Sequence, residues 1–476
     1  MKKDKAMSKE NSRIITVLIV LIILFIGLIV YLTYFEVFKA DTIENNTYNK
    51  RTWMEEEYTL RGSIYDRNNV LLAYSNQAED LSQTRHYEYS SLYSHIIGYS
   101  SKTMGKEGLE KSYNKELLNI SESPSLNEIR KIMAQSNFQQ KGNDLILTID
   151  HTLQQYANDL LGKQKGSIVV MNPTNGEVYA MVSYPDFDPN ALEENWESIN
   201  ESPDSPLINR ATEGLYAPGS IFKIITTTSA LENQNIDTNF NCQGQVNISG
   251  RDFKDYNSIA HGQVNLHQAL VKSCNVSFGQ IALQLGQNSL KETAEKFMLN
   301  QKIPFDISTN PSKFSKDRMD KLDLAYTGIG QGKTLVTPLN MAMMASTIAN
   351  EGEMVQPILV KKVSSSDGET IKTQETKVLS RVMSRETASL IKDMMIDVVN
   401  EGTGRNASLS SVQVAGKTGT AEVKEQKNHV WFVGFAPADQ PKIAVAVVLE
   451  NNGSTGGSAA APIARDVIAK ALEVIE

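Results

Sequence analysis

The chain opens with one long hydrophobic run and then turns polar, and apolar residues become dense again only after about residue 144. Residues 14–35 are uncharged and apolar, and a helix of that length can cross a bilayer core of about 30 Å. A cleaved signal peptide is the alternative, but its apolar core spans only about 7–15 residues and ends in small residues. This run ends in Tyr31-Leu-Thr-Tyr-Phe35. We therefore predict an uncleaved transmembrane helix over residues 14–35.

The charges before this run predict its orientation. Residues 1–13 contain five basic residues and two acidic ones. Because basic flanks stay on the cytoplasmic side, we expect a cytoplasmic tail over 1–13 and an extracytoplasmic location for everything after residue 35. The chain is thus predicted to be a single-pass protein of the cell membrane.

Two regions follow the predicted anchor. Residues 36–143 are polar and turn-rich, with a possible short helix over 126–134, and they predict a small mixed membrane-proximal domain. Residues 144–476 carry the denser apolar pattern and predict a larger second domain. At 476 residues with 41% hydrophobic content, the chain is long enough for two to three domains with sizeable cores.

The pattern of the second region predicts an α+β fold. Residues 166–171 and 177–182 are apolar, partly β-branched runs on either side of the turn sequence 172–176, so they predict an antiparallel hairpin. Further strands are predicted over 412–415, 429–435 and 443–449. Helical patterns cover 221–232, 276–285, 338–349 after a Thr337 cap, 385–399 and 459–475. Five strands from distant segments should form one antiparallel sheet covered by helices.

Charge and cysteine content narrow the function. The 47 basic and 55 acidic residues give a net charge of −8, which does not support nucleic-acid binding. Cys242 and Cys274 would lie in a compartment that permits a disulfide without requiring one, and two free buried thiols are equally compatible with the sequence. The six histidines show no H-E-x-x-H spacing and the two cysteines show no C-x-x-C spacing, so no metal site is predicted.

A serine nucleophile with a lysine base is predicted at Ser220-Ile-Phe-Lys223. The same S-x-x-K pattern occurs at Ser112 and Ser389, but only Ser220 follows a loop-like Ala-Pro-Gly segment. At the start of a helix, the Ser220 N–H is free to donate to an oxyanion, and Lys223 lies on the same helix face. Lys223 can act as a base only if burial or nearby cations lower its pKa. A helix cap and a solvated lysine are the plain alternatives.

A second candidate fragment is Ser273-Cys-Asn275. S-x-N is a common tripeptide, also found at Ser125, Ser198 and Ser308, but Ser273 leads into a strong helical pattern. Its hydroxyl could relay a proton beside Lys223, and the Asn275 amide could bind a substrate amide. The alternative is a capping Ser273 with a structural Asn275.

The third fragment, Lys417-Thr418-Gly419, is the only K-[ST]-G in the chain. Gly416 and Gly419 would leave the backbone uncovered, as an edge strand needs if an extended peptide is to pair with it. Lys417 and the hydroxyls of Thr418 and Thr420 would hold a terminal carboxylate, and the Thr420 N–H could complete an oxyanion hole. A glycine-rich hairpin end is the alternative.

The order S-x-x-K, S-x-N, K-T-G matches the motif set of penicillin-binding proteins and β-lactamases. With these motifs the chain resembles the short, monofunctional class B penicillin-binding proteins, of the penicillin-binding protein A type. Asn69 stands where the family usually has glycine, and Cys274 takes the variable middle position of S-x-N. Further segments that resemble family signatures are 61–68, 108–110, 147–150, 186–190, 330–332 with 337–338, and 431–434.

The resemblance implies a fold, a reaction and partners. The fold is a penicillin-binding, serine β-lactamase-like transpeptidase domain on a dimerisation-like pedestal. The reaction is peptidoglycan D,D-transpeptidation: Ser220 attacks the bond between two terminal D-alanines of a stem peptide, releases D-alanine, and passes the acyl group to an amine. β-Lactams would acylate Ser220, no cofactor is needed, and a polytopic glycan polymerase of the shape, elongation, division and sporulation (SEDS) class is the implied partner.

Three alternatives to the transpeptidase remain. A D,D-carboxypeptidase would use the same residues with water as the acceptor, and a β-lactamase would need an efficient deacylating base that the sequence does not locate. A non-catalytic β-lactam sensor or scaffold would keep the fold, but it would be free to lose Ser220 and Lys223.

Overall fold

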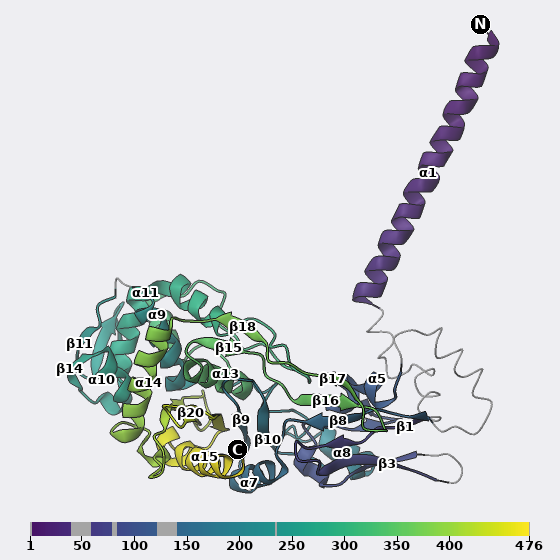
Figure 1. Cartoon of the computed structure of the whole chain (residues 1–476). Helices are drawn as coiled ribbons and strands as arrows, with labels where there is room; N and C mark the ends of the chain where they lie inside the picture. The colour runs from purple at the N-terminus through teal and green to yellow at the C-terminus, as the bar shows by residue number, and fades with distance from the viewer. Residues whose placement is uncertain (1, 40–58, 79–82, 121–139, 234–235, 476) are drawn as a thin grey trace. The chain divides into compact units, whose positions relative to one another are not determined.

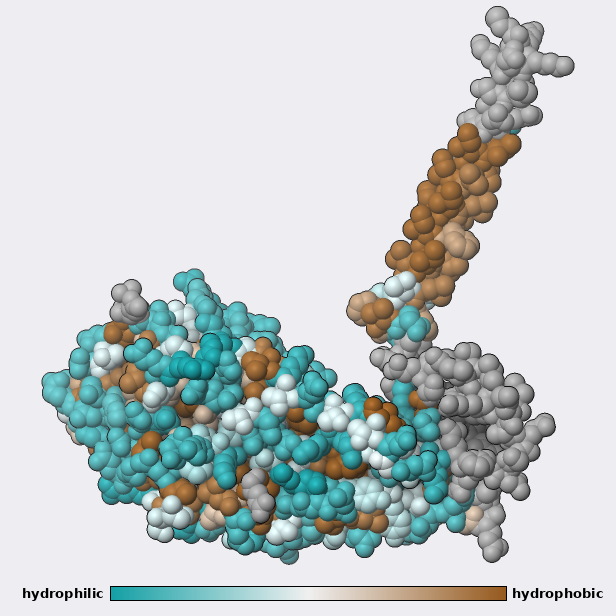
Figure 2. Space-filling view, viewed as in Figure 1, coloured by the Kyte–Doolittle hydropathy of each residue, from teal (hydrophilic) through white to brown (hydrophobic). Residues whose placement is uncertain are grey.

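The computed structural model describes residues 2–39, 59–78, 83–120, 140–233 and 236–475. The chain divides into two units, residues 1–59 and 60–476, which we describe separately. The first contains helix α1 (Lys2–Phe38), whose segment Arg13–Phe38 has exposed side chains and includes an 18-residue window with a mean hydropathy of 3.3. In Figure 2 the surface of this segment is apolar, whereas the surface of the second unit is largely polar. The predicted apolar helix is confirmed; the predicted helix over 126–134 lies outside the described residues.

A five-stranded antiparallel sheet forms the centre of the second unit, as predicted (Figure 1). Its order is β10 (Val178–Tyr184), β9 (Gly166–Met171), β21 (Ile443–Leu449), β20 (His429–Ala436) and β19 (Ala415–Ala421). The predicted strand over 412–415 is misplaced, because β19 begins where that prediction ends and contains the whole K-T-G motif. Its glycines and threonines give no apolar pattern, and the strand exists because it pairs residue by residue with β20.

Helices cover both faces of this sheet. Alternate residues of a strand point to opposite faces, and Val169 and Met171 join one hydrophobic cluster whereas Ile168 and Val170 join another. Helix α13 (Pro338–Ala349) packs on the first face, with the predicted Thr337 cap accepting from the Asn340 N–H at 3.3 Å. Helices α7 (His151–Leu161) and α15 (Ala461–Val474) pack on the second face, and α14 (Arg385–Asn400) lies beside β19.

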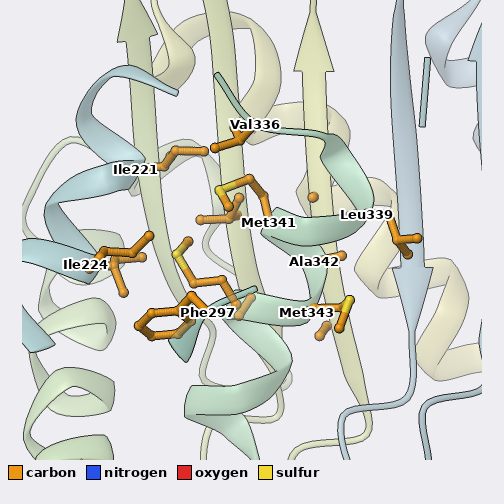
Figure 3. Packing of buried hydrophobic residues seen from close by; sticks show 14 of the residues in the cluster. Ile221, Ile224, Phe297, Val336, Leu339, Met341, Ala342 and Met343 are labelled. Carbon is orange, nitrogen blue, oxygen red and sulfur yellow. The ribbon is translucent and has the colours of Figure 1, made fainter. Parts of the chain in front are cut away.

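The helical segment that contains Ser220 packs against the hydrophobic core through its apolar side chains. It consists of a 3₁₀ turn, η3 (Gly219–Phe222), that continues into α9 (Lys223–Leu231). Ile221 and Ile224 are fully buried in the same hydrophobic cluster as Met341 of α13, and Figure 3 shows the Ile221 side chain beside Val336. Because such interiors are close-packed, this apolar contact fixes the start of the helix against the sheet.

A second, six-stranded sheet joins the membrane-proximal region to later segments. Its order is β17 (Thr370–Thr373), β16 (Val360–Ser364), β8 (Asp144–Leu147), β2 (Ile64–Tyr65), β3 (Leu71–Gln77) and β4 (Gln83–Tyr87). Two of these strands, β16 and β17, come from residue 360 onward, so the regions on either side of the predicted boundary at 143/144 share one sheet. The division of 36–143 from 144–476 stays a sequence-based prediction.

The remaining elements are short strand pairs and helices around these sheets. The strand pairs include β5 (Ser100–Ser101) with β6 (Gly105–Lys106), β11 (Asn239–Cys242) with β14 (Gly262–Asn265), β12 (Gln245–Ile248) with β13 (Arg251–Lys254), and β15 (Glu353–Val355) with β18 (Val378–Arg381). The helices include α4 (Gly108–Ser112), α5 (Asn114–Leu117), α8 (Leu192–Asn200), α10 (Leu266–Val271), α11 (Asn275–Lys296) and α12 (Lys321–Gly328).

A buried ionic cluster holds the membrane-proximal region together. Arg61 Nε donates to Glu110 at 2.5 Å, Arg85 Nε donates to the other carboxylate oxygen at 2.7 Å, and Arg61 Nη1 donates to Asn114 at 2.6 Å. Burial works to raise the pKa of Glu110, but the two guanidiniums outweigh it and the pKa lies below its ordinary value. Two of the family-like segments, at Arg61 and Glu110, thus meet through this cluster.

Candidate active site

Ser220 lies in η3, where two glycine contacts fix the backbone. Gly219 has φ +54°, and a Cβ there would lie 2.5 Å from the Thr420 carbonyl oxygen, so only glycine fits. The Gly219 N–H donates to the Gly330 carbonyl at 2.9 Å. Side chains three residues apart are eclipsed in a 3₁₀ turn, so Ser220 and Lys223 project from the same side of the chain. This is the loop-to-helix position that the sequence predicts.

Lys223 is fully buried and bonded to the S-x-N turn. Its Nζ donates to the Ser273 carbonyl at 2.5 Å, to Asn275 Oδ1 at 2.7 Å and to Ser273 Oγ at 3.2 Å. Burial lowers the pKa of Lys223 to about 8, with the Asp255 carboxylate and the Cys274 sulfur acting in the opposite direction. The condition set for a lysine base, a lowered pKa through burial, is met.

Ser273 occupies a strained turn between α10 and α11. Its φ is +58°, an unusual value for a residue with a side chain. The predicted alternative, a helix-capping Ser273, is wrong, because Cys274 is the N-cap and its Sγ accepts from the Ser277 N–H at 3.4 Å. Strain of this kind persists only where the surroundings hold it. The Ser273 hydroxyl is thereby free to face the two lysines.

Lys417, the first residue of the K-T-G motif, also contacts Ser273. Its Nζ is fully buried and donates to Ser273 Oγ at 3.0 Å and to the Thr418 carbonyl at 3.0 Å. Burial, with the neighbouring charge of Lys223, holds the pKa of Lys417 well below its ordinary value. Ser273 Oγ therefore bridges two buried amines that come from segments far apart in the sequence.

Gly416 and Gly419 are required for a reason other than the one predicted from the sequence. Strand β19 is an edge strand of the five-stranded sheet, as expected. However, a Cβ on Gly416 would lie 2.3 Å from the Phe432 ring, and one on Gly419 would lie 2.8 Å from the Pro218 carbonyl oxygen. These glycines therefore allow close packing against the protein's own core.

The two threonines of β19 have partners that sequence reasoning did not identify. Thr418 Oγ1 shares a 2.6 Å hydrogen bond with Thr403 Oγ1, and Thr420 Oγ1 accepts from the Gly456 N–H at 3.2 Å. Thr403 follows α14 in a segment without apolar periodicity, and no short motif marks it. Only its place in the fold brings it to β19.

The competing S-x-x-K segments have no comparable setting. Ser389 and Lys392 both lie within α14, which begins with its own Ser384 cap. Ser112 is the last residue of α4, and Lys115 lies in the next short helix, α5. Of the three tetrapeptides, the one at Ser220 is the one whose lysine bonds to the S-x-N turn.

A serine at the start of a helix, beside two buried lysines and a sheet edge, defines the class of penicillin-interacting serine enzymes. The chain belongs to the penicillin-binding protein transpeptidase family: residues 166–469 match the penicillin binding protein transpeptidase domain. Residues 61–145 match the penicillin binding protein A dimerisation domain.

Curated relatives and solved structures agree with this assignment. The peptidoglycan D,D-transpeptidase PbpA of Mycolicibacterium smegmatis is 32% identical over 92% of this chain and 94% of its own length. Penicillin-binding protein A from M. tuberculosis, solved as a ceftriaxone acyl-enzyme complex, is 30% identical with a TM-score of 0.82, covering 88% of this chain and 100% of that one. A D,D-transpeptidase domain from Eggerthella lenta is 35% identical, with a TM-score of 0.79 over 88% of this chain and 99% of that one.

The comparisons confirm the main predictions from the sequence. The α+β fold with an antiparallel sheet covered by helices, the class B penicillin-binding protein family and the serine-type D,D-transpeptidase activity are those of the matched proteins.

Proposed function

We propose that this protein cross-links peptidoglycan through an acyl-enzyme on Ser220, which β-lactams also acylate. The observation that carries this proposal is the bridge of Ser273 Oγ between Lys223 and Lys417, at 3.2 and 3.0 Å. It joins all three motifs into one site that contains a nucleophile, a base of lowered pKa and a proton relay.

In the proposed acylation step, the neutral amine of Lys223 takes the proton of Ser220 while Oγ attacks the carbonyl between two D-alanines. The C–N bond then breaks, the leaving amine takes a proton through Ser273, and D-alanine departs. The N–H groups of Ser220 and Thr420 stabilise the oxyanion, since backbone donors near the start of a helix and on an edge strand are fixed in advance. No metal or organic cofactor takes part.

Lys417, Thr418 and Thr420 are the proposed binding site for the terminal carboxylate, and Asn275 and the edge of β19, including Gly419, hold the peptide. A carboxylate that arrives beside Lys417 favours its charged form and raises its pKa again. The Lys417 ammonium and the anionic end of the substrate therefore stabilise each other, which favours substrates with a free C-terminus.

The acceptor distinguishes the transpeptidase from the D,D-carboxypeptidase alternative, and a β-lactam sensor would form the acyl-enzyme without turnover. We propose that an amine of a neighbouring strand, and not water, takes the acyl group. The support is the family of the matched relatives, which are named D,D-transpeptidases.

We further propose that α1 anchors the protein in the cell membrane with residues 1–13 in the cytoplasm and the active site outside. The apolar stretch Arg13–Phe38 and the basic residues before it support this orientation. The membrane-proximal region, residues 36–143, would serve as a pedestal that contacts a SEDS-class glycan polymerase. Co-purification of that polymerase with the full chain, lost on deletion of residues 60–120, tests the contact.

One experiment tests the proposed nucleophile and the acceptor together. Full-length protein in detergent is given a stem-peptide thioester with and without an acceptor amine, and the Ser220→Ala variant serves as the control. We expect a cross-linked product and an acyl-enzyme in the wild type alone. Labelling of the alanine variant by penicillin would refute Ser220 as the nucleophile, and mainly hydrolysed product would favour the carboxypeptidase.

A further inference from the structure

The side-chain amide of Gln331 pairs with the backbone of Glu422, the residue that follows β19. It donates to the Glu422 carbonyl at 3.3 Å and accepts from the Glu422 N–H at 2.9 Å. The orientation of the amide is assigned from these two partners, because only this orientation gives each of them a complementary group. A side-chain amide offers the same donor and acceptor as a peptide group. Gln331 therefore takes the place of a neighbouring strand at this residue.

The turn that carries Ser220 holds Gln331 in position. The Gln331 N–H donates to the Tyr326 carbonyl at 3.0 Å. The residue before it, Gly330, has φ +74°, and a Cβ there would lie 2.2 Å from the Gly219 carbonyl oxygen, so only glycine allows this approach. The Gln331 side chain is half-buried. Its contact with the end of β19 is thus fixed from the nucleophile turn.

This contact decides which backbone groups of β19 a peptide can reach. Every second residue of a strand turns its N–H and C=O groups to the same edge, so Thr418, Thr420 and Glu422 share one. It is the edge facing the nucleophile turn, since a Cβ on Gly219 would lie 2.5 Å from the Thr420 carbonyl oxygen. The Thr418 carbonyl accepts from Lys417 Nζ at 3.0 Å, and the amide described above takes both groups of Glu422. Thr420 lies between these occupied positions.

We propose that Gln331 limits the pairing of the donor peptide with β19 to Thr420. In the proposed reaction the terminal carboxylate lies at Lys417 and the attacked carbonyl at Thr420, so the peptide runs antiparallel to β19. Its next residue on the same edge, the second residue before the two D-alanines, would meet Glu422. Because Gln331 already pairs there, the donor leaves the edge strand at that residue. The site then selects the D-alanine end and requires no regular peptide backbone further on. This inference rests on the proposed function.

The test compares two thioester donors that differ in one N–H group. One is N-acetyl-Gly-L-Ala-D-alanyl thiolactate, whose glycine would meet Glu422, and the other has an ester oxygen in place of the glycine N–H. The measurement is kcat/KM for acylation of the full-length protein in detergent. In the wild type we expect the two values to agree within about twofold. In Gln331→Ala, which opens the Glu422 carbonyl, the glycine donor should react about fivefold faster than the ester donor, as expected for one hydrogen bond.

Two further variants control for structure. Gln331→Asn has an amide one methylene shorter and should behave like the alanine variant. Gln284 makes the same kind of contact elsewhere, accepting from the Asp237 N–H at 2.9 Å and donating to its carbonyl at 3.5 Å. Gln284→Ala should therefore keep the wild-type ratio of the two donors. A merely structural role of Gln331 would slow both donors alike and leave their ratio unchanged.

Two results would overturn the proposal. The first is a wild type that already prefers the glycine donor by about fivefold, since that N–H would then have an acceptor; this measurement needs no variant and so does not depend on how a variant folds. The second is a ratio that stays within about twofold in a Gln331→Ala protein that is still labelled by penicillin. Acylation with an unchanged ratio refutes the role of Gln331 alone. If neither donor forms an acyl-enzyme on Ser220, the proposed function fails and this inference fails with it.

Discussion

The lowered pKa of Lys223 makes a quantitative prediction for the pH dependence of acylation. Only the neutral amine can take the proton of Ser220, so the rate of acylation should follow the fraction of neutral Lys223. With a pKa of about 8, that fraction is roughly one-hundredth at pH 6, one-tenth at pH 7 and nine-tenths at pH 9. The rate should therefore rise about tenfold per pH unit below 8 and level off above about 9.

The size of the pKa shift of Lys223 comes from the burial of its amine. At an ordinary lysine pKa, the neutral fraction at pH 7 would be about 300-fold smaller, which corresponds to roughly 3 kcal/mol in the barrier. The structure supplies this shift by enclosing Lys223 completely, which disfavours its charged form. Lys417 stands beside it, and a positive charge there would lower the pKa of Lys223 further.

The assay is the second-order rate of acylation of the full-length protein by a chromogenic β-lactam in stopped flow, from pH 6 to 9.5, corrected for hydrolysis without enzyme. Lys223→Arg stays charged over this range and should lose at least about a hundredfold in rate, with no rise. Lys272→Arg, an exposed neighbour of the S-x-N turn, should keep the wild-type profile. A wild-type rate that is flat, or one that still climbs tenfold per unit at pH 9, would refute the reasoning.

Three further substitutions test contacts around the site and the pedestal. Glu110→Ala leaves two buried guanidiniums without their anion and should lower the free energy of unfolding by about 3–5 kcal/mol, measured as a lower thermal midpoint of the full chain. Gly219→Ala forces a Cβ to 2.5 Å from the Thr420 carbonyl and should abolish penicillin labelling while the circular dichroism spectrum is kept. Thr403→Val removes the hydroxyl that bonds to Thr418 and should slow stem-peptide acylation by about fivefold, the equivalent of one hydrogen bond of about 1 kcal/mol.

Each has a matched control. Glu107→Ala removes an exposed carboxylate on the same segment, and an equal loss of stability there would contradict the role of burial. Gly368→Ala also has positive φ, but nothing lies near its Cβ, so loss of labelling in that variant would show that strain alone acts. Thr403→Ser keeps the hydroxyl. If this variant were also acylated slowly, the loss of rate would be due to the packing of the Thr403 methyl group and not to the hydrogen bond.

The sequence by itself determined the elements that have a strong apolar period and the motifs that have a fixed spacing. The apolar helix α1, the hairpin of β9 and β10, the strands β20 and β21, and the capped helix α13 are all visible in local patterns. Ser220 could be separated from its rivals because a loop precedes it and two later motifs follow in order. These features depend only on neighbours in the chain, and local propensity is enough to predict them.

Tertiary structure alone decided what depends on contacts between distant segments. Strand β19 carries glycines and threonines with no apolar pattern, and it forms because β20 pairs with it. The strained φ of Ser273, the lowered pKa values of Lys223 and Lys417, and the partner of Thr418 arise from burial and approach across more than a hundred residues in some cases. The meeting of Cys242, Asp255, His261 and Cys274 has the same origin, because folding brings one polar atom from each of four separate segments to within 4.8 Å of the others.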